Sequence, residues 1–383
     1  MRAALIAIPQ PGEGPSPKVA GKTIAHRQLL FAREAGCKSV TAFGNGASPE
    51  GIELRHAAER MGLKYHVISS AHALPGIIRD DDSLMVLQPG LLPESRVALE
   101  LLRAEGDRIL VVSAGPGASA GFERVDLDRA WAGSMTVPGH LLGKLADLPE
   151  DIAPHGALLR IALQHRLPEA RLADDALDNG GWTLVSTPEA AAAQTLAWQR
   201  RHLRETSPAR LSRWIARFLA TGPTRRLLDL PYIRSGLLVL AGLMLGGGIA
   251  SGLYERPVLG FALIALSVPV VEFFLALGAL AVAPFGKLRH WPWLGYAVDA
   301  ALLALGILAI DSLAHRSVFP PLVLGSALLL LDRRGLPAWL EPLRDRMVIG
   351  GFLAIVASLA SPELAIMLAG LLVLFANIIP PRS

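Results

Sequence analysis

The apolar residues divide this chain into two regions. Residues 1–200 alternate short apolar runs with mixed stretches, whereas the apolar residues after Leu230 form long, nearly uninterrupted runs. The charge, glycine and alanine content of the first region is that of a cytoplasmic α/β protein. We therefore expect a cytoplasmic domain over residues 1–195, a basic amphipathic linker over residues 196–230 and a membrane domain over residues 231–380.

In the first region the short apolar runs predict β-strands, and the stretches between them predict helices. Strands are expected at Ala3–Ile8, Ser39–Ala42, Lys64–Ile68, Ser83–Leu87, Arg108–Val112 and Trp182–Val185. Helices are expected at about 23–35, 49–61, 93–104, 138–146, 155–165 and 188–203. This alternation favours a Rossmann-like α/β fold with a mostly parallel sheet covered on both faces.

The second region predicts an all-α membrane domain of six helices. A helix needs about 20 mostly apolar residues to span a bilayer, because hydrocarbon offers no water to satisfy the backbone. The stretches that approach this length are 232–253, 257–283, 293–312, 317–331, 346–361 and 363–380. The fourth is short and begins near Pro320 and Pro321, and without it the C-terminus would change sides.

The positions of the basic residues predict the orientation, because positively charged loops stay in the cytoplasm. The segment before the first apolar stretch holds Arg200, Arg201, Arg204, Arg210, Arg213, Arg217, Arg225, Arg226 and Arg234. The loops after the second and fourth stretches are also basic, while the opposite loops hold only Arg256 and Arg316. We expect a multi-pass protein of the inner (cytoplasmic) membrane with both termini in the cytoplasm.

The composition indicates which kinds of molecule this chain binds. A hydrophobic fraction of 52% is too high for two ordinary soluble domains. The net charge is only +4, and the basic residues gather beside the long apolar runs, which favours membrane lipids over nucleic acid as the partner. The single cysteine, Cys37, excludes an internal disulfide and a multi-cysteine metal site.

A helix lying in the membrane interface is expected between Pro208 and Ala220. Its apolar residues recur at helical spacing, at Leu211, Trp214, Ile215, Phe218 and Leu219. This stripe would lie at the acyl boundary with basic residues at the headgroup phosphates. The candidate headgroup ligands are Arg210, Arg213, Arg217, Arg225 and Arg226. A helix packed on the cytoplasmic domain would show the same pattern.

Two acidic residues fall inside predicted spans, Glu272 in the second and Asp299 in the third. An ionisable side chain at that depth costs about 2.5–3.5 kcal/mol on insertion scales, so it usually faces a cavity, a partner or an ion. Both are therefore candidate catalytic residues, and Asp299 is also a candidate metal ligand. The alternative is a structural acid that is hydrogen-bonded between helices.

A loop with glycines follows the first predicted strand, from Pro9 to Lys18. Backbone N–H groups of such a turn can contact phosphate, and a nearby lysine adds positive charge. Gly12, Gly14 and Lys18 are thus candidate phosphate-binding residues. Runs of glycine and proline also form ordinary turns, which leaves both readings open.

Several motifs in residues 1–195 occur in a set order. Pro17-Lys18 precedes Gly21-Lys22-Thr23-Ile24, Ala35-Gly36 precedes the second strand, and Trp182 precedes Thr187-Pro188-Glu189. Together they resemble the molybdopterin-guanylyltransferase-like (GT-A type) nucleotidyltransferases. The resemblance implies a nucleotidyltransferase-like fold, a nucleotide as ligand and Mg²⁺ as cofactor.

This chain departs from that family where the metal would bind. The glycine loop is contracted, and Gln88-Pro89-Gly90 supplies no carboxylate after the fourth strand. Leu184 and Ser186 stand where the family has aspartates. Because Mg²⁺ needs hard oxygen ligands, metal-dependent transfer is not expected here.

The membrane region carries a second resemblance. Gly295-Tyr296-Ala297-Val298-Asp299 is similar to part of the motif of six-span CDP-alcohol phosphotransferases, and the basic segment before the first span is similar to theirs. The order of the two domains resembles bifunctional enzymes that make CDP-inositol and join it to inositol phosphate. Leu275 and Leu303 stand where that family has metal-binding aspartates, so Glu272 and Asp299 are the candidate remnants. The resemblance also implies a homodimer.

Two functions follow from these patterns. We favour a catalytically degenerate pseudoenzyme of the nucleotidyltransferase/CDP-alcohol phosphotransferase type, a scaffold or regulator in phospholipid headgroup synthesis, because both regions lack metal carboxylates. The alternative is an active bifunctional transferase that activates a polyol or sugar phosphate with NTP and transfers it in the membrane. Expected partners are membrane lipids, a nucleotide, and a second copy or another membrane enzyme. The sequence is compatible with both an active transferase and a protein without catalytic activity.

Overall fold

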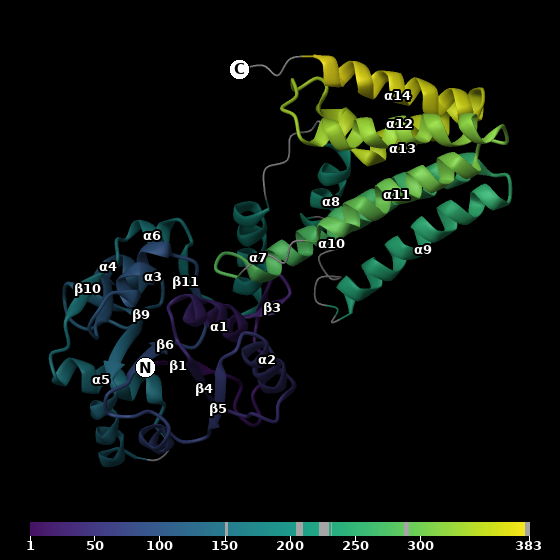
Figure 1. Cartoon of the computed structure of the whole chain (residues 1–383). Coiled ribbons are helices and arrows are strands. Elements are labelled where there is room, and N and C mark those ends of the chain that lie inside the picture. Colours follow the sequence, from purple (N-terminus) through teal and green to yellow (C-terminus); the bar gives the residue numbers. More distant parts are fainter. Residues whose placement is uncertain (150–151, 204–209, 222–229, 231, 287–290, 380–383) are drawn as a thin grey trace. The chain divides into compact units, whose positions relative to one another are not determined.

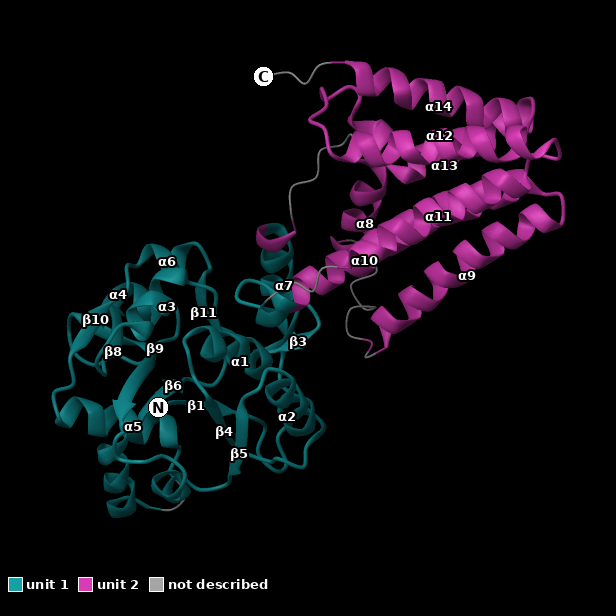
Figure 2. Cartoon of the chain, viewed as in Figure 1, with its two compact units in different colours: residues 1–200, 282–287 teal, residues 201–281, 288–383 magenta. Residues whose placement is uncertain are grey.

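The structure is a computed structural model that describes residues 1–149, 152–203, 210–221, 230, 232–286 and 291–379 (Figure 1). The chain divides into two compact units (Figure 2). Unit 1 comprises Met1–Arg200 and Val282–Lys287, and unit 2 comprises Arg201–Ala281 and Leu288–Ser383. The short segment 282–287, which the sequence placed in the membrane domain, therefore belongs to unit 1.

Unit 1 is built on a seven-stranded sheet with the strand order β10-β8-β9-β6-β1-β4-β5. The strands are β10 (Glu169–Arg171), β8 (Ile109–Ser113), β9 (Arg129–Pro138), β6 (Ser83–Leu87), β1 (Arg2–Ala7), β4 (Ser39–Phe43) and β5 (Lys64–Ile68). β9 runs antiparallel to both neighbours, and every other pair of neighbours is parallel. The predicted mostly parallel α/β sheet is confirmed.

Both faces of this sheet are buried. Along β1, Ala4 and Ile6 point into one apolar core, and Ala3 and Leu5 point into the other. The first core is covered by α1 (Ile24–Glu34), α2 (Pro49–Arg60) and α3 (Arg96–Arg103). The second is covered by two 3-10 helices (Ala71–Gly76 and Gly139–Asp147) and by α5 (Pro154–Gln164). Burial on both faces explains why the inner strands β1, β6 and β8 are nearly continuous apolar runs.

Short elements complete unit 1. β2 (Lys18–Val19) pairs with β3 (Lys22–Thr23), and β7 (Leu91–Pro93) pairs with β11 (Trp182–Leu184). The remaining helices are α4 (Ala114–Ser119), α6 (Asp175–Asp178) and α7 (Pro188–His202). The predicted strand at Trp182–Val185 thus exists, but β11 lies in a separate two-stranded ribbon.

The sequence did not predict β9, the longest strand of the sheet. Its apolar run is interrupted by Ser134 and Thr136, which are nevertheless fully buried. The Ser134 hydroxyl donates to the Val86 carbonyl oxygen at 3.1 Å, and the Thr136 hydroxyl accepts from the Arg108 N–H at 2.9 Å. Because these hydrogen bonds satisfy the hydroxyls, a central strand tolerates polar residues that mask its pattern.

Unit 2 is helical. Its described helices are α8 (Leu211–Thr221), α9 (Ile233–Leu253), α10 (Pro257–Val282), α11 (Pro292–Leu308), α12 (Ala314–Asp332), α13 (Arg346–Leu359) and α14 (Pro362–Ile378). Each of the six predicted apolar stretches forms a helix. Three of them, α9, α10 and α12, are long and apolar enough to cross a membrane, while α11, α13 and α14 are shorter apolar helices. Three candidate spans are thus shown.

Glycines let α9, α10 and α11 approach closely. A Cβ atom added at Gly260 would lie 2.3 Å from the Ser251 hydroxyl, 2.6 Å from the Gly248 carbonyl oxygen and 2.6 Å from a methyl group of Leu305. Only glycine fits where backbone and side chains meet at these distances. This contact belongs to unit 2 and helps to set the spacing of its helices.

Candidate functional site

The carboxyl ends of β1, β4 and β6 lie at one edge of the sheet, because these neighbouring strands are parallel. This edge is where α/β folds most often bind ligands. The loops after β1 and β4 touch there, since the Asn45 N–H donates to the Pro9 carbonyl oxygen at 3.0 Å. Gly44 has φ +140°, and a Cβ atom on it would lie 2.3 Å from the Ile8 carbonyl oxygen.

The loop after β1 contains the predicted phosphate-binding glycines. Gln10 to Glu13 form a β-turn in which the Glu13 N–H donates to the Gln10 carbonyl oxygen at 3.0 Å and Gly12 has φ +89°. The Glu13 carboxylate accepts from the Gln10 N–H at 2.7 Å. The turn itself requires Gly12, and one backbone donor is already bound to an acid of the same loop.

Gly14 and Lys18 lie further along this loop. Both are exposed, and no neighbour approaches the Cα of Gly14 closely enough to exclude a side chain. Lys18 begins β2, and across the ribbon Lys22 donates to Glu53 at 2.8 Å. Phosphate binding by Gly12, Gly14 and Lys18 stays a prediction.

The loop after β6 is fixed by a residue that the sequence did not single out. The Gln28 side-chain amide, on α1, donates to the carbonyl oxygens of Gln88 at 2.8 Å and Leu91 at 2.9 Å. The side-chain oxygen of Gln88 is buried without a hydrogen-bond partner among the described residues. A Cβ atom at Gly133 would lie 2.8 Å from that oxygen. No motif marks Gln28, because only folding places it beside the loop.

In unit 2 Glu272 is paired. The Arg213 guanidinium, from α8, donates to a carboxylate oxygen of Glu272 on α10 at 3.1 Å. The two side chains are 42% and 24% exposed, so the pair lies at the surface of the unit. This pairing agrees with the alternative of a structural acid hydrogen-bonded between helices, and a catalytic role of Glu272 stays a prediction.

Asp299 is also paired, and more completely. Arg346, at the start of α13, donates to both carboxylate oxygens of Asp299 at 2.7 and 3.1 Å. The same guanidinium donates to both oxygens of Asp332, at the end of α12, at 3.0 and 2.7 Å. Arg346 is 9% exposed. One arginine therefore joins α11, α12 and α13.

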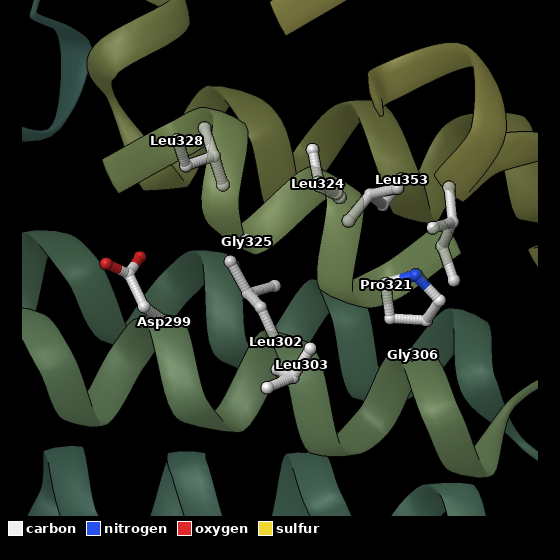
Figure 3. Close-up of a pocket in the computed structure, with 10 residues that line it drawn as sticks. Asp299, Leu302, Leu303, Gly306, Pro321, Leu324, Gly325, Leu328 and Leu353 are labelled. Carbon is white, nitrogen blue, oxygen red and sulfur yellow. The ribbon is translucent and has the colours of Figure 1, made fainter. Parts of the chain in front are cut away.

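Asp299 also lines a pocket in unit 2 (Figure 3). The other lining residues are Leu302, Leu303, Gly306, Pro321, Leu324, Gly325, Leu328, Leu353 and Ile366. Asp299 is the only charged residue among them, and Arg346 already binds both of its oxygens. The pocket therefore offers an apolar wall and no free charge.

The residue before Arg346 joins the same helices to α8. The Asp345 carboxylate accepts from the Met347 N–H at 3.0 Å, which caps α13, and from the Ser212 N–H of α8 at 2.7 Å. Arg210, just before α8, donates to Glu341 at 3.1 Å. These bonds fix α8 within unit 2.

The helix α8 has one buried face and one exposed face. Ser212, Ala216 and Ala220 are buried, while Trp214 and Phe218 are 50% and 56% exposed and stack with ring centroids 5.9 Å apart. Small side chains thus pack inward and the aromatic ones project outward.

The predicted headgroup arginines fall into three groups. Arg210 and Arg213 bind carboxylates of unit 2, at Glu341 and Glu272. Arg217 is half-buried and makes no ion pair within the described part of the chain. Arg225 and Arg226 lie outside the described residues. Headgroup binding by these arginines stays a prediction.

The residues present do not fit the Mg²⁺ that the resemblance implies. Among the described residues, no group of three or more His, Cys, Asp or Glu side chains is arranged to hold a metal ion. Glu13 is bound to its own turn, and Arg346 occupies both oxygens of Asp299. A hard divalent cation needs several free oxygen ligands, which these two acids do not offer.

No family model and no curated protein matches this chain. Similar solved structures include a UDP-glucose pyrophosphorylase from Acinetobacter baumanii, with 12% sequence identity and a TM-score of 0.38, covering 53% of this chain and 94% of that one. Another is a UDP-glucose pyrophosphorylase complexed with UDP-glucose, with 10% identity and a TM-score of 0.37, covering 52% and 99%. Likeness at this level assigns no activity to this chain.

Proposed function

We propose that this chain is an integral membrane protein of the nucleotidyltransferase/CDP-alcohol phosphotransferase type in which both the α/β unit and the helical unit are catalytically degenerate, and that it serves as a scaffold or regulator for another membrane enzyme. The pairing of Arg346 with Asp299 and Asp332 carries this proposal. A carboxylate whose two oxygens bind a buried guanidinium cannot hold a metal ion without breaking that pair, and breaking it leaves charges without partners.

The sheet edge of unit 1 supports the same proposal. Glu13 is the only acidic residue in the loops 8–18, 44–48 and 88–91. Its carboxylate is bound to the Gln10 N–H. Transfer of a nucleotidyl group crowds negative phosphate oxygens, which need a cation held by such acids. A nucleotide bound near Gly12, Gly14 and Lys18 would therefore act as a ligand and not as a substrate.

The membrane placement has its own support. The helices α9, α10 and α12 meet the length and apolarity of a span, and α11 and α14, with 17 residues each, reach the lower end of the range of about 17–25. The basic segment before the first span and the basic loops after the second and fourth spans favour six spans in the inner membrane, with both termini in the cytoplasm.

The partner enzyme belongs, on the sequence resemblance, among those that build phospholipid headgroups. A second copy of the chain is the other candidate. Exposed apolar side chains such as Leu243 on α9 and Phe375 on α14 leave surface for lipid or for another membrane protein.

Two measurements test the proposal. Purified full-length protein is given CTP or another NTP, Mg²⁺ and a panel of sugar and inositol phosphates, with an active nucleotidyltransferase as positive control. We expect no pyrophosphate release above the protein-free background. Release that disappears in the Lys18→Ala variant would overturn the proposal and establish an active transferase.

The scaffold part is tested in native membranes by cross-linking followed by mass spectrometry. We expect a stable complex with a second membrane enzyme. A chain recovered alone, from membranes in which other complexes survive, would exclude a scaffold.

A further inference from the structure

The core of unit 1 contains a residue from far along the chain. Phe285 is 8% exposed and lies in the apolar cluster that covers one face of the sheet, together with Phe31, Trp182 and Cys37. It belongs to the segment 282–287, which Figure 2 shows in the colour of unit 1. The rest of unit 1 ends at Arg200, and the chain between Arg200 and this segment belongs to unit 2. Unit 1 is therefore not completed by its first 200 residues.

The ring of Phe285 has a defined geometry. Its centroid lies 5.3 Å from that of Phe31 at an interplanar angle of 77°, and Phe31 lies 5.7 Å from Trp182 at 64°. Both pairs are edge-to-face, the arrangement that aromatic quadrupoles favour. Phe31 is fully buried, on α1, and Trp182 is fully buried, on β11. The three rings form one continuous aromatic cluster with Phe31 in the middle.

A buried arginine holds the backbone beside Phe285. Arg27 is 2% exposed, and its guanidinium donates to the Ala283 carbonyl oxygen at 3.3 Å and to the Val19 carbonyl oxygen at 2.9 Å. It also lies 4.1 Å from the centre of the Trp198 ring of α7. A charged group so deeply buried is held by specific partners, and one of those partners is the distant segment.

We propose that α1, supported by Trp182 of β11 against Phe31 and by Trp198 of α7 against Arg27, forms a docking site for the tripeptide Ala283-Pro284-Phe285, and that the docked tripeptide positions the loop after β6. Arg27 and Phe31, one helical turn apart on α1, contact the tripeptide. Gln28, next to Arg27, holds the carbonyl oxygens of Gln88 and Leu91. One helix thus contacts both the tripeptide and the candidate ligand edge. This inference does not depend on whether the domain is catalytic.

The chain supplies its own reporter for this docking site. Cys37 is the only cysteine, is 2% exposed and belongs to the same cluster as Phe285. Burial raises the pKa of its thiol to about 12, so the thiol reacts only when the cluster opens. The rate of Cys37 labelling therefore measures opening of this core.

The test uses the full-length protein and the variant Phe285→Ala. We expect Cys37 to be labelled at least about tenfold faster, because the aromatic cluster loses its outer ring. We also expect faster amide hydrogen exchange at residues 88–92, which a purely local cavity would not cause. Phe218→Ala is the matched control, because Phe218 is 56% exposed on α8, and it should leave both rates unchanged.

Adding the tripeptide back tests the docking site itself. A synthetic peptide of residues 281–287 should slow the labelling of the Phe285→Ala protein, and the same peptide with alanine for the phenylalanine should not. Unchanged labelling and exchange in Phe285→Ala would overturn the proposal, as would equal effects of the two peptides. If Phe285→Ala fails to fold, Phe285→Leu decides, with a smaller acceleration at both places expected and no change contradicting the proposal.

Discussion

The Arg346 guanidinium donates two hydrogen bonds to the Asp299 carboxylate, from Nε to Oδ1 at 2.7 Å and from Nη2 to Oδ2 at 3.1 Å. The two residues are 47 positions apart in sequence. Bidentate geometry uses the planar fork of the guanidinium, which lysine cannot reproduce. An acid that looked like a remnant of a metal site in the sequence is thus part of the framework of the helical unit.

Arg346→Ala should destabilise unit 2 strongly. It leaves Asp299 and Asp332 without their shared cation, and removing one partner of a buried pair costs about 3–5 kcal/mol. The measurement is the free energy of SDS-induced unfolding of the purified protein. Arg316→Ala is the control, because its side chain is 58% exposed in its pair with Glu363 and should cost at most about 1 kcal/mol. Equal losses in the two variants would show that the Arg346 pair is not structural.

The stability of unit 1 should fall in mild acid. Burial lowers the pKa of His155 to about 4, and burial with nearby positive charges lowers the pKa of His26 to about 3. Both values lie below the 6.5 of an unfolded chain, so the unfolded state binds more protons below that pH. Their full contribution is present above about pH 7 and is lost as the pH falls from about 6.5 towards 4, at roughly 1.4 kcal/mol per pH unit for each histidine.

The variant His155→Phe isolates one of these groups. Urea unfolding followed by tryptophan fluorescence from pH 7 to pH 4.5 should show a shallower pH dependence in the variant than in the wild type. His66 is exposed on β5, so His66→Phe should keep the wild-type dependence. A slope that His155→Phe leaves intact would rule out His155 as a source of the acid sensitivity.

Alanine at Gly44 should disrupt the candidate ligand edge. The new Cβ atom would lie 2.3 Å from the Ile8 carbonyl oxygen, so the loops after β1 and β4 could not keep their contact. We expect a loss of more than about 4 kcal/mol in thermal or urea unfolding. Gly62 also has a positive φ, +74°, but open space around it. Gly62→Ala should cost only the backbone strain of about 1–2 kcal/mol, and a similar loss at both positions would argue against the contact.

The exposed aromatic side of α8 should lie against lipid. Protein reconstituted in vesicles with brominated acyl chains should show a component of tryptophan quenching that is absent from Trp214→Phe. Arg210 and Arg213 bind carboxylates in unit 2, so this component should persist at high salt. Trp198→Phe is a control of another kind, because Trp198 is fully buried in unit 1 and should contribute no such component. Quenching that Trp214→Phe leaves unchanged would place α8 away from the bilayer.

The sequence predicted the positions of helices and strands better than the contacts that their side chains make. The parallel strands β1, β4, β5 and β6 were predicted from short apolar runs and the six apolar helices from long ones, and the length of such a run depends only on neighbouring residues. The strand β9 was not predicted, because Ser134 and Thr136 interrupt its apolar run and their burial depends on hydrogen bonds that the hydrophobic pattern does not reveal. The predicted helix at 138–146 is a 3-10 helix (Gly139–Asp147), a tighter form that hydrophobic spacing does not distinguish.

For the candidate site residues too, the sequence indicated the residues and only the structure gave their partners. Glu272, Asp299 and Gly12 were visible from the sequence because an acid in an apolar run and a glycine after a strand are unusual locally. What each one does depends on its partner, and those partners are Arg213, Arg346 and the turn of Glu13. Gln28 carried no local signal at all.

The sequence by itself determined that this chain joins an α/β domain to an apolar helical one, because periodicity and apolar length depend only on neighbouring residues. Only the tertiary structure decided that Arg346 neutralises Asp299 and that Phe285 completes a core beside Phe31. Ion pairs and ring contacts act over a few ångströms in space, and residues far apart in the chain reach such distances only after folding.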